Sequence, residues 1–104
     1  MIYPIGKSRY NSDSRRFTAP DGKEKKLTPT QGRLFKCLIE NKNKTVPKAT
    51  LLGILGREEN CKKGNHTLYV FIGRLKKVIK ADGHLEIDTS YGKGYGLKEH
   101  EWGK

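Results

Sequence analysis

Histidines and cysteines are the residues of this chain with the widest chemical repertoire, because both can bind metals or act in catalysis. They are few and scattered: His66, His84, His100, Cys37 and Cys61. The histidines have no ligand spacing relative to the cysteines, so the sequence does not indicate a zinc site. Two cysteines are too few for a disulfide framework, and Cys37 beside an apolar stripe is typical of a buried, unreactive thiol. We therefore expect neither a metal nor a cofactor.

Acidic residues and alternating glycines near the C-terminus suggest two further kinds of chemistry. Asp82, Glu86 and Asp88 have the residue types of a metal-dependent nuclease, but helix capping and strand solubility explain them better. The glycines at positions 92, 94 and 96 alternate as in a phosphate-binding loop, yet no helix follows them, as a dinucleotide site requires. The sequence therefore does not predict an enzyme.

Positive charge is the strongest bulk property of the chain. Its 104 residues carry 22 lysines and arginines against 11 acidic residues, which gives a net charge of +11. Such an excess favours polyanionic partners, namely DNA, RNA or an anionic membrane. A chain of this length is expected to form one domain. No run approaches the roughly 18 apolar residues of a membrane span and no secretory signal follows Met1, so we expect a cytoplasmic protein.

A basic amphipathic helix is predicted from about Asn65 to Ala81. Its apolar side chains fall in one narrow arc, whose members are Leu68, Ile72, Leu75 and Ile79, flanked by Phe71 and Val78. This arc is typical of a core-facing side. The opposite arc holds His66, Val70, Gly73, Arg74 and Lys77, with Lys76 and Lys80 on one flank. A charged helix face is usually only solvated, but this one is followed at once by a glycine-rich hairpin. Asp82-Gly83 ends the helix, the strands lie around residues 85–87 and 95–97, and the turn spans 91–94.

The preceding residues are predicted to support this helix and hairpin. Residues 1–28 favour a small antiparallel meander, with a disordered basic arm as the alternative. Thr28-Pro29-Thr30-Gln31 has the pattern of a capping box and starts a helix that ends at residues 41–44. Gly32 inside this helix is unfavourable by about 1 kcal/mol relative to alanine. A second helix is predicted from Pro47 to about Leu55, followed by a polar loop over residues 57–64.

The order of meander, three helices and hairpin is that of an α+β winged helix-turn-helix domain with an N-terminal antiparallel β-sheet and a C-terminal β-hairpin wing. The segment from Leu27 to Leu97 resembles the OmpR/PhoB-type effector domain of bacterial transcription regulators. The resemblance rests on LTPTQGRLFKCL, VPKATLLGILG, TLYVFIGRLKKVI and TSYGKGYGL, in this order. We accordingly divide the chain into residues 1–28, the N-terminal meander of the same domain, residues 29–98, the winged helix-turn-helix, and residues 99–104, a tail.

The resemblance implies a regulator that binds double-stranded DNA with the helix of about 65–81 in the major groove and a wing of about 89–95 on the backbone or minor groove. The implied contact residues are His66, Thr67, Val70, Gly73, Arg74, Lys77, Thr89, Tyr91 and Lys93. Tyr91 stands where the family usually carries an arginine that enters the minor groove, so the basic contact is expected to pass to Lys93. Phe71 replaces a common polar or histidine side chain, and Gly73 a frequent serine or arginine. Binding is therefore expected to depend mainly on Arg74 and on phosphate contacts.

Further partners are implied by the resemblance alone. The loop of residues 56–64 is where the family often contacts RNA polymerase, and head-to-tail homodimers on DNA are a family property. A branch resembling ToxR and CadC continues into a membrane helix. The chain fits that branch, at the cytoplasmic face of the inner membrane, if it continues beyond Lys104, and fits a free-standing regulator equally. Two alternatives stay open: a basic RNA-binding protein, and a winged-helix protein-interaction module.

Overall fold

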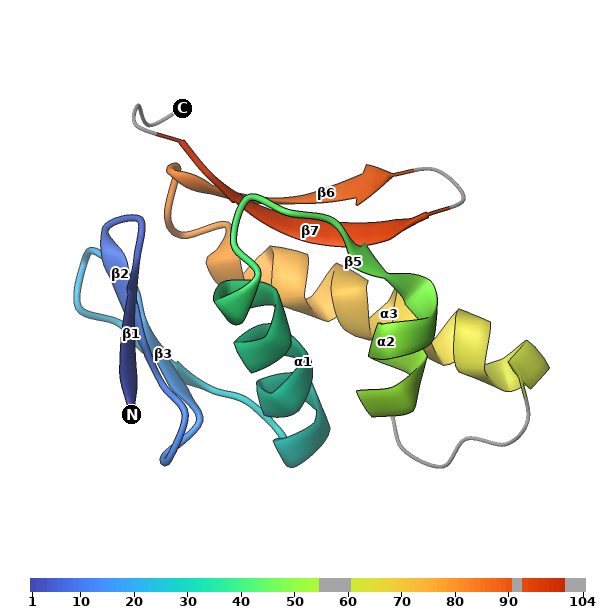
Figure 1. The fold of residues 1–104 in the computed structure, drawn as a ribbon. Coiled ribbons are helices and arrows are strands. Elements are labelled where there is room, and N and C mark those ends of the chain that lie inside the picture. Colours follow the sequence, from blue (N-terminus) through green and yellow to red (C-terminus); the bar gives the residue numbers. More distant parts are fainter. Residues whose placement is uncertain (55–60, 91–92, 101–104) are drawn as a thin grey trace.

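The computed structural model describes the fold of residues 1–54, 61–90 and 93–100, and the side chains over these ranges except those of 61–67 and 90. Over this part of the chain, helices α1 (Pro29–Glu40), α2 (Lys48–Ile54) and α3 (Cys61–Ile79) pack against two antiparallel sheets (Figure 1). The first sheet has the order β1 (Ile2–Ile5), β2 (Ser8–Asn11), β3 (Arg16–Thr18) and β4 (Glu24–Lys26). The second has the order β5 (Val46–Pro47), β7 (Gly94–Glu99) and β6 (Leu85–Ser90). The predicted winged-helix fold class is confirmed.

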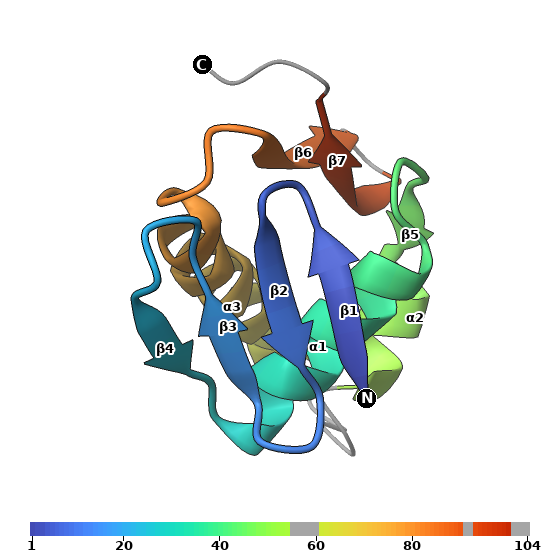
Figure 2. The same cartoon turned by 90° about the vertical axis from the view of Figure 1, so that its left-hand side faces the viewer.

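The N-terminal sheet packs its inner face against α1. Tyr10 of β2 and Phe17 of β3 are fully buried, and their rings meet that of Phe35 edge-on at centroid distances of 5.0 and 5.9 Å. Aromatic pairs attract each other in this geometry, beyond the apolar area that they bury. Figure 2 views this sheet face-on, with the helices behind it. The predicted meander is therefore confirmed, the disordered arm is wrong, and the sheet shares one core with the helices.

Helix α1 begins at the predicted capping box. Thr28 Oγ1 accepts a hydrogen bond from the Gln31 N–H at 3.2 Å, and Gln31 Oε1 accepts one from the Thr28 N–H at 3.1 Å. The structure also explains the glycine that follows. A Cβ atom at Gly32 would lie 2.7 Å from Oη of Tyr10, whose ring is held in the core. Gly32 thus lets the sheet approach the helix, and this packing offsets its low helix propensity.

Helix α2 begins at Lys48, and the prediction that it starts at Pro47 is wrong. Pro47 belongs instead to β5, where Val46 pairs with Tyr95 and Pro47 with Gly94. The residue before a proline prefers extended backbone, which fits Val46 to a strand. The sequence signal for this strand is weak because β5 is two residues long and its partner lies almost fifty residues away in the chain.

Helix α3 begins at Cys61, four residues before its predicted start, so residues 61–64 are helical and were wrongly assigned to a loop. These residues are polar and carry no apolar period, which is why the pattern did not reveal them. The remainder of that predicted loop lies outside the described residues. The predicted core arc is confirmed, because its four members are at most 2% exposed: Leu68, Ile72, Leu75 and Ile79. The helix ends at Ile79, where its carbonyl accepts from the Asp82 N–H.

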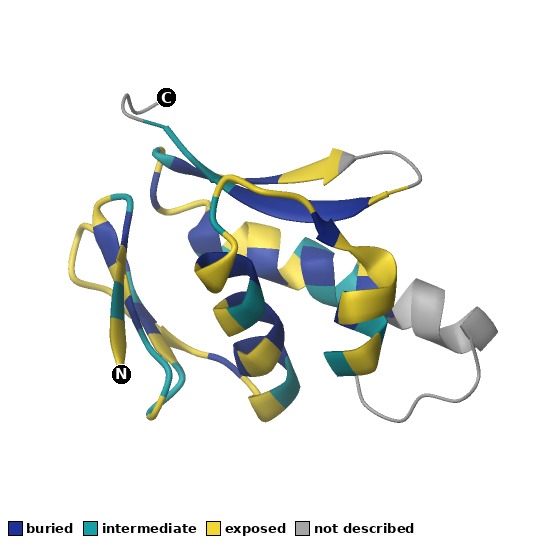
Figure 3. Ribbon diagram, in the orientation of Figure 1, coloured by how far each residue is buried: buried dark blue, intermediate teal, exposed yellow. Residues whose placement is uncertain are grey.

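Strands β6 and β7 form the predicted hairpin. Because β7 extends to Glu99, the tail begins one residue later than predicted. Figure 3 shows β7 buried over most of its length, while the far end of β6 is exposed. Ile87 and Leu97, which pair across the two strands, are both buried in the common core. The hairpin is therefore fixed to the core and, through β7, to β5, while Asp88, Thr89 and Lys93 are exposed.

Asp82 is a buried junction between three elements. Its Oδ2 accepts from the Ser8 hydroxyl at 2.6 Å and from the Lys7 N–H at 2.7 Å, and its Oδ1 accepts from the His84 N–H at 2.8 Å. Burial alone would raise the pKa of Asp82, but these hydrogen bonds outweigh it and hold the pKa below its ordinary value. The side chain thereby joins the β1–β2 turn to the end of α3 and the start of β6.

Candidate nucleic-acid interface

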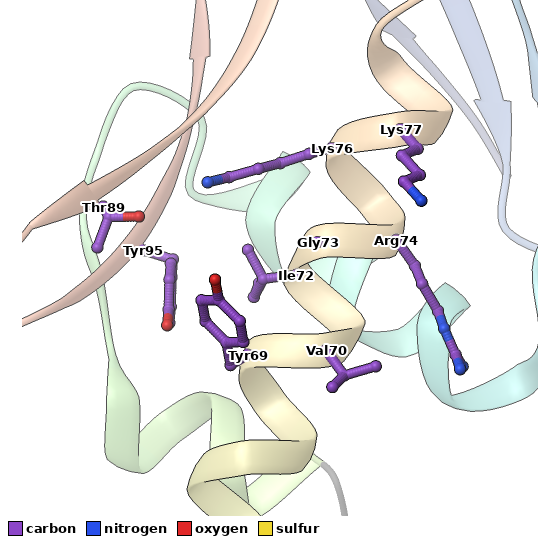
Figure 4. Close-up of a pocket in the computed structure, with 9 residues that line it drawn as sticks. All are labelled: Tyr69, Val70, Ile72, Gly73, Arg74, Lys76, Lys77, Thr89 and Tyr95. Carbon is purple, nitrogen blue, oxygen red and sulfur yellow. The ribbon is translucent and has the colours of Figure 1, made fainter.

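A cleft of about 550 Å³ lies between α3 and the β6–β7 hairpin (Figure 4). Its lining residues are Tyr69, Val70, Ile72, Gly73, Arg74, Lys76, Lys77, Thr89 and Tyr95. Its described lining holds basic, aromatic and hydroxyl side chains, and none of these described residues is acidic. Because the helix and the hairpin both contribute, a ligand that enters the cleft contacts the two elements together.

One row of side chains extends from α3 toward the hairpin. Tyr69 and Lys76 point to that side, where Thr89 and Tyr95 face them (Figure 4). Thr89 and Tyr95 are cross-strand partners in the hairpin, so their spacing is fixed by the β-ladder. Tyr69 is 69% exposed, which is unusual for a large aromatic side chain and leaves its ring accessible to a ligand. This row therefore presents three hydroxyl groups and one ammonium group to the cleft.

A second row extends from α3 away from the hairpin and contains Val70, Arg74 and Lys77 (Figure 4). The guanidinium carbon of Arg74 lies 5.6 Å from the centroid of the Phe71 ring. A cation over an aromatic face at this distance gains about 0.5–1 kcal/mol at an exposed site, so Phe71 helps to orient Arg74. Phe71 itself packs half-buried against the core, which explains an apolar residue at this position of the helix.

Gly73 lies between the two rows. No heavy atom lies within 4 Å of the position that its Cβ would take, so packing in this chain does not require a glycine here. The missing side chain leaves the helix backbone accessible at the centre of the cleft. Arg74, Lys76 and Lys77 around it are exposed, and the ion pairs found among the described residues involve none of them.

The structure brings five of the predicted contact residues together in the cleft: Val70, Gly73, Arg74, Lys77 and Thr89. Lys93 is exposed on the hairpin, and its carbonyl accepts from the Lys48 N–H at 3.1 Å. His66 and Thr67 lie in α3, but their side chains are outside the described residues, as is Tyr91 entirely.

Sequence reasoning missed Tyr69, Lys76 and Tyr95 as lining residues. The helical pattern separates the buried side from the opposite side, but it does not show on which flank the hairpin lies. The direct connection from α3 into β6 is the signal that could have assigned that flank, because a short turn keeps the hairpin beside the helix. Tyr69 and Lys76, seven residues apart, lie on the flank that faces it.

Other chemistry has little support in the described part of the chain, where no three residues of the types His, Cys, Asp and Glu cluster to hold a metal. Asp82 is occupied by its hydrogen bonds, and the His100 ring lies 2.7 Å from Glu86. Burial raises the pKa of the half-buried Cys37 thiol, with the Glu40 charge adding to the effect, so the thiol stays protonated at neutral pH. None of the described helices has the length and apolarity that crossing a membrane requires.

Solved structures with this fold include several from bacterial regulators. The C-terminal domain of the nisin resistance regulator NsrR, a lantibiotic response regulator, is 29% identical with a TM-score of 0.71, covering 91% of this chain and 95% of its own. The DNA-binding domain of Escherichia coli CadC is 20% identical with a TM-score of 0.76, covering 89% and 87%. The DNA-binding domain of E. coli CpxR is 21% identical with a TM-score of 0.75, covering 95% and 97%.

Sequence comparison gives the family itself. No curated protein sequence matches the chain. Residues 22–97 match the family model described as "Transcriptional regulatory protein, C terminal", which covers α1 to α3 and nearly the whole hairpin. The match covers well over half of the chain and agrees with the fold of the solved structures. The chain therefore belongs to the OmpR/PhoB-type family of winged-helix DNA-binding domains of transcriptional regulatory proteins.

Proposed function

We propose that this domain binds double-stranded DNA with α3 in the major groove and the β6–β7 hairpin on the adjacent backbone or minor groove. The cleft of Figure 4 carries the proposal, because helix and hairpin line it together and its described lining contains three cations and no acidic residue. A major groove about 12 Å wide admits one α-helix. The exposed basic face of α3 and the wing beside it match that surface in shape and charge.

Roles can be assigned from the two rows of side chains. Arg74, oriented by Phe71, is the residue best suited to pair with a guanine edge, because its planar fork bonds two acceptors at once. Gly73 allows the helix backbone to approach the base edges closely. Lys76, Lys77 and Thr89 are placed to contact phosphates. His66, Thr67, Val70, Tyr91 and Lys93 complete the proposed interface.

The residues missed by sequence reasoning add one element to the proposal. Tyr69 and Tyr95 supply hydroxyl groups on the hairpin side of the cleft, next to the Lys76 ammonium group. A DNA strand whose backbone runs between α3 and the hairpin would accept hydrogen bonds from these groups. They supply neutral hydrogen-bond donors in a wing that has Tyr91 in place of the family's usual charged arginine.

Binding to duplex DNA is expected to weaken steeply with salt. If roughly five phosphates are contacted, the logarithm of the association constant falls with the logarithm of salt concentration at a slope of about −4 to −5. Fluorescence anisotropy with a labelled duplex over a range of salt concentrations measures this slope. A slope near zero would favour a protein-interaction module, and tighter binding to single-stranded RNA of equal length would favour the RNA-binding alternative.

Arg74→Ala and Lys93→Ala are expected to differ in kind. Loss of Arg74 removes a base contact, so the preference for the selected site over a scrambled duplex falls by about 1–3 kcal/mol. Loss of Lys93 removes a phosphate contact, so binding to both duplexes weakens alike and the salt slope becomes shallower by about 1. The site is first selected from random duplexes. An unchanged preference in Arg74→Ala would show that α3 reads no base through this residue.

Two finer partners belong to the same proposal. Residues 56–64 follow α2 in the chain and include the first residues of α3. The family resemblance supports contact with RNA polymerase there. The resemblance likewise supports head-to-tail dimers on direct repeats. It also supports a location in the bacterial cytoplasm, where the DNA lies. Comparing affinity for one half-site with that for two tests the dimer, because cooperative copies bind the double site more tightly than independent ones.

A further inference from the structure

We infer that the edge of the N-terminal sheet forms a second phosphate-binding surface, which extends the DNA footprint beyond α3 and the hairpin. This inference rests on the proposed function. A hollow of about 260 Å³ lies between β4 and the C-terminal part of α3. Three lysines line it: Lys25 in β4, Lys23 in the turn directly before β4, and Lys77 in the helix. We name these three residues the sheet-edge lysines.

Lys77 connects this hollow to the DNA-binding cleft, because it lines both. Basic side chains therefore line both hollows, from the hairpin side of α3 to β4, and Lys77 is common to the two. Figure 2 shows β4 at the outer edge of the sheet, with α3 behind β3 and reaching this end of the molecule. A polyanion bound in the cleft would meet the sheet-edge lysines on leaving it.

The charges of the sheet-edge lysines are available to a ligand. All three are exposed, and the ion pairs found over the described residues do not include them. The acidic residue that also lines the hollow is Glu24, and its carboxylate lies 3.1 Å from the guanidinium of Arg16 on the neighbouring strand. Arg16 thus counters the negative charge of Glu24, and the nearby Asp21 carboxylate accepts from the Lys23 N–H.

The backbone around Lys23 is held in place. The Lys23 carbonyl accepts from the Ala19 N–H at 2.8 Å, and the Lys23 N–H donates to Asp21 Oδ1 at 3.0 Å. Phe17 and Ala19, which form the apolar floor of the hollow, are buried in the core. A lysine on a fixed turn loses less conformational freedom on binding than one on a mobile arm.

The length of α3 makes this surface reachable. Its 19 residues span roughly 28 Å, more than twice the width of about 12 Å of the major groove. A helix of this length in the groove carries its C-terminal end past a bounding phosphate backbone. Lys77 lies close to that end, and β4 lies beside it. The sheet-edge lysines are therefore placed for phosphates outside the groove, where they contribute affinity and no base preference.

The test compares two double variants that each remove two positive charges. Lys23→Gln/Lys25→Gln removes the sheet contribution and spares Lys77, which belongs to the cleft. Arg33→Gln/Lys36→Gln is the matched control, since both residues line a separate hollow on α1 that shares no residue with the cleft or with the β4 hollow. Both variants are titrated against the selected duplex and a scrambled duplex at several salt concentrations, after circular dichroism shows equal folding.

For Lys23→Gln/Lys25→Gln we expect the salt slope to become shallower by about 1–2, with affinity falling roughly tenfold per lost contact near 0.1 M salt. The ratio of affinities for the selected and scrambled duplexes should not change. The α1 control should keep the slope of the unmodified domain. If the domain binds duplex DNA steeply but both variants behave alike, this inference is overturned and the proposed function stands. If the unmodified domain binds no duplex, both are overturned.

Discussion

Gly94→Ala is expected to lower the free energy of unfolding by about 3 kcal/mol, which corresponds to a fall in Tm of roughly 12 °C or more for a domain of this size. The reason is a collision with backbone. A Cβ at position 94 would overlap the carbonyl oxygen of Val46, and it would also lie 2.9 Å from the carbonyl carbon of Val46 and 3.1 Å from Cα of Pro47. These atoms belong to β5, which pairs with β7 at this point. A rotamer change cannot relieve such an overlap, so the strands must separate.

The same substitution is expected to weaken DNA binding beyond its effect on stability. The pairing of β5 with β7, together with the hydrogen bond from the Lys48 N–H to the Lys93 carbonyl, holds the wing against the start of α2. When the strands separate, the hairpin side of the cleft moves relative to α3. We expect reduced affinity for duplex DNA even at temperatures where circular dichroism shows the variant folded.

Gly53→Ala is the matched control for Gly94→Ala. Gly53 is exposed in α2, and no heavy atom lies within 4 Å of the position of its Cβ. Replacing a helical glycine by alanine at an open position adds up to about 1 kcal/mol of stability. Urea unfolding of the three proteins measures the difference. Equal unfolding free energies for Gly94→Ala and Gly53→Ala would show that β5 does not pack on β7 as described.

These glycines also show where sequence reasoning reached its limit. Alternation and helical periodicity are local properties, and they correctly predicted the capping box at Thr28, the core side of α3 and the two strands of the hairpin. The reason for Gly94 is a strand nearly fifty residues earlier, and the reason for Gly32 is the hydroxyl of Tyr10. Both depend on contacts between distant segments, which no local pattern contains.

The residues of the candidate site were also only partly predictable from local sequence patterns. The helical pattern selected Val70, Gly73, Arg74 and Lys77, and all four line the cleft. It did not select Tyr69, because an aromatic residue next to the core side is usually buried, whereas this one is 69% exposed. The sheet-edge lysines were equally hidden, since they come together only when β4 lies beside the end of α3.

Asp82→Asn is expected to lower the free energy of unfolding by about 3 kcal/mol at pH 7, because it breaks hydrogen bonds to a charged, buried acceptor. The two carboxylate oxygens accept from Ser8, Lys7 and His84. An asparagine keeps one acceptor oxygen but presents an NH₂ group to donors on the other side. In either orientation of the amide, at least one backbone donor, the Lys7 N–H or the His84 N–H, would face the NH₂ group and lose its acceptor. Because Asp82→Asn removes the charge and keeps the shape of the side chain, the change in unfolding free energy measures the loss of hydrogen bonds and not a loss of packing.

The lowered pKa of Asp82 determines how its contribution to stability changes with pH. The pKa of Asp82 is lowered in the folded protein, so its contribution is fully present above the unfolded-state pKa, near 3.8, and is lost as the pH falls through the folded-state pKa. The stability gap between the unmodified domain and Asp82→Asn should be constant from about pH 6 to 8 and close below about pH 4. Glu99, whose pKa is lowered first by its hydrogen bond with Lys42, also loses stabilisation in acid. That loss is common to both proteins and cancels in the gap.

Asp88→Asn is the control for Asp82→Asn, because it makes the same chemical change at an exposed position of β6. Its unfolding free energy should stay within about 0.5 kcal/mol of the unmodified domain. Two results would contradict the assignment of Asp82 as a charged junction. One is an Asp82→Asn variant as stable as Asp88→Asn at pH 7, and the other is a gap that persists unchanged at pH 3. A gap that closes in acid would show that the carboxylate charge joins the N-terminal sheet to the end of α3. That junction anchors the β1–β2 side of the sheet, whose opposite edge, β4, carries the second phosphate-binding surface.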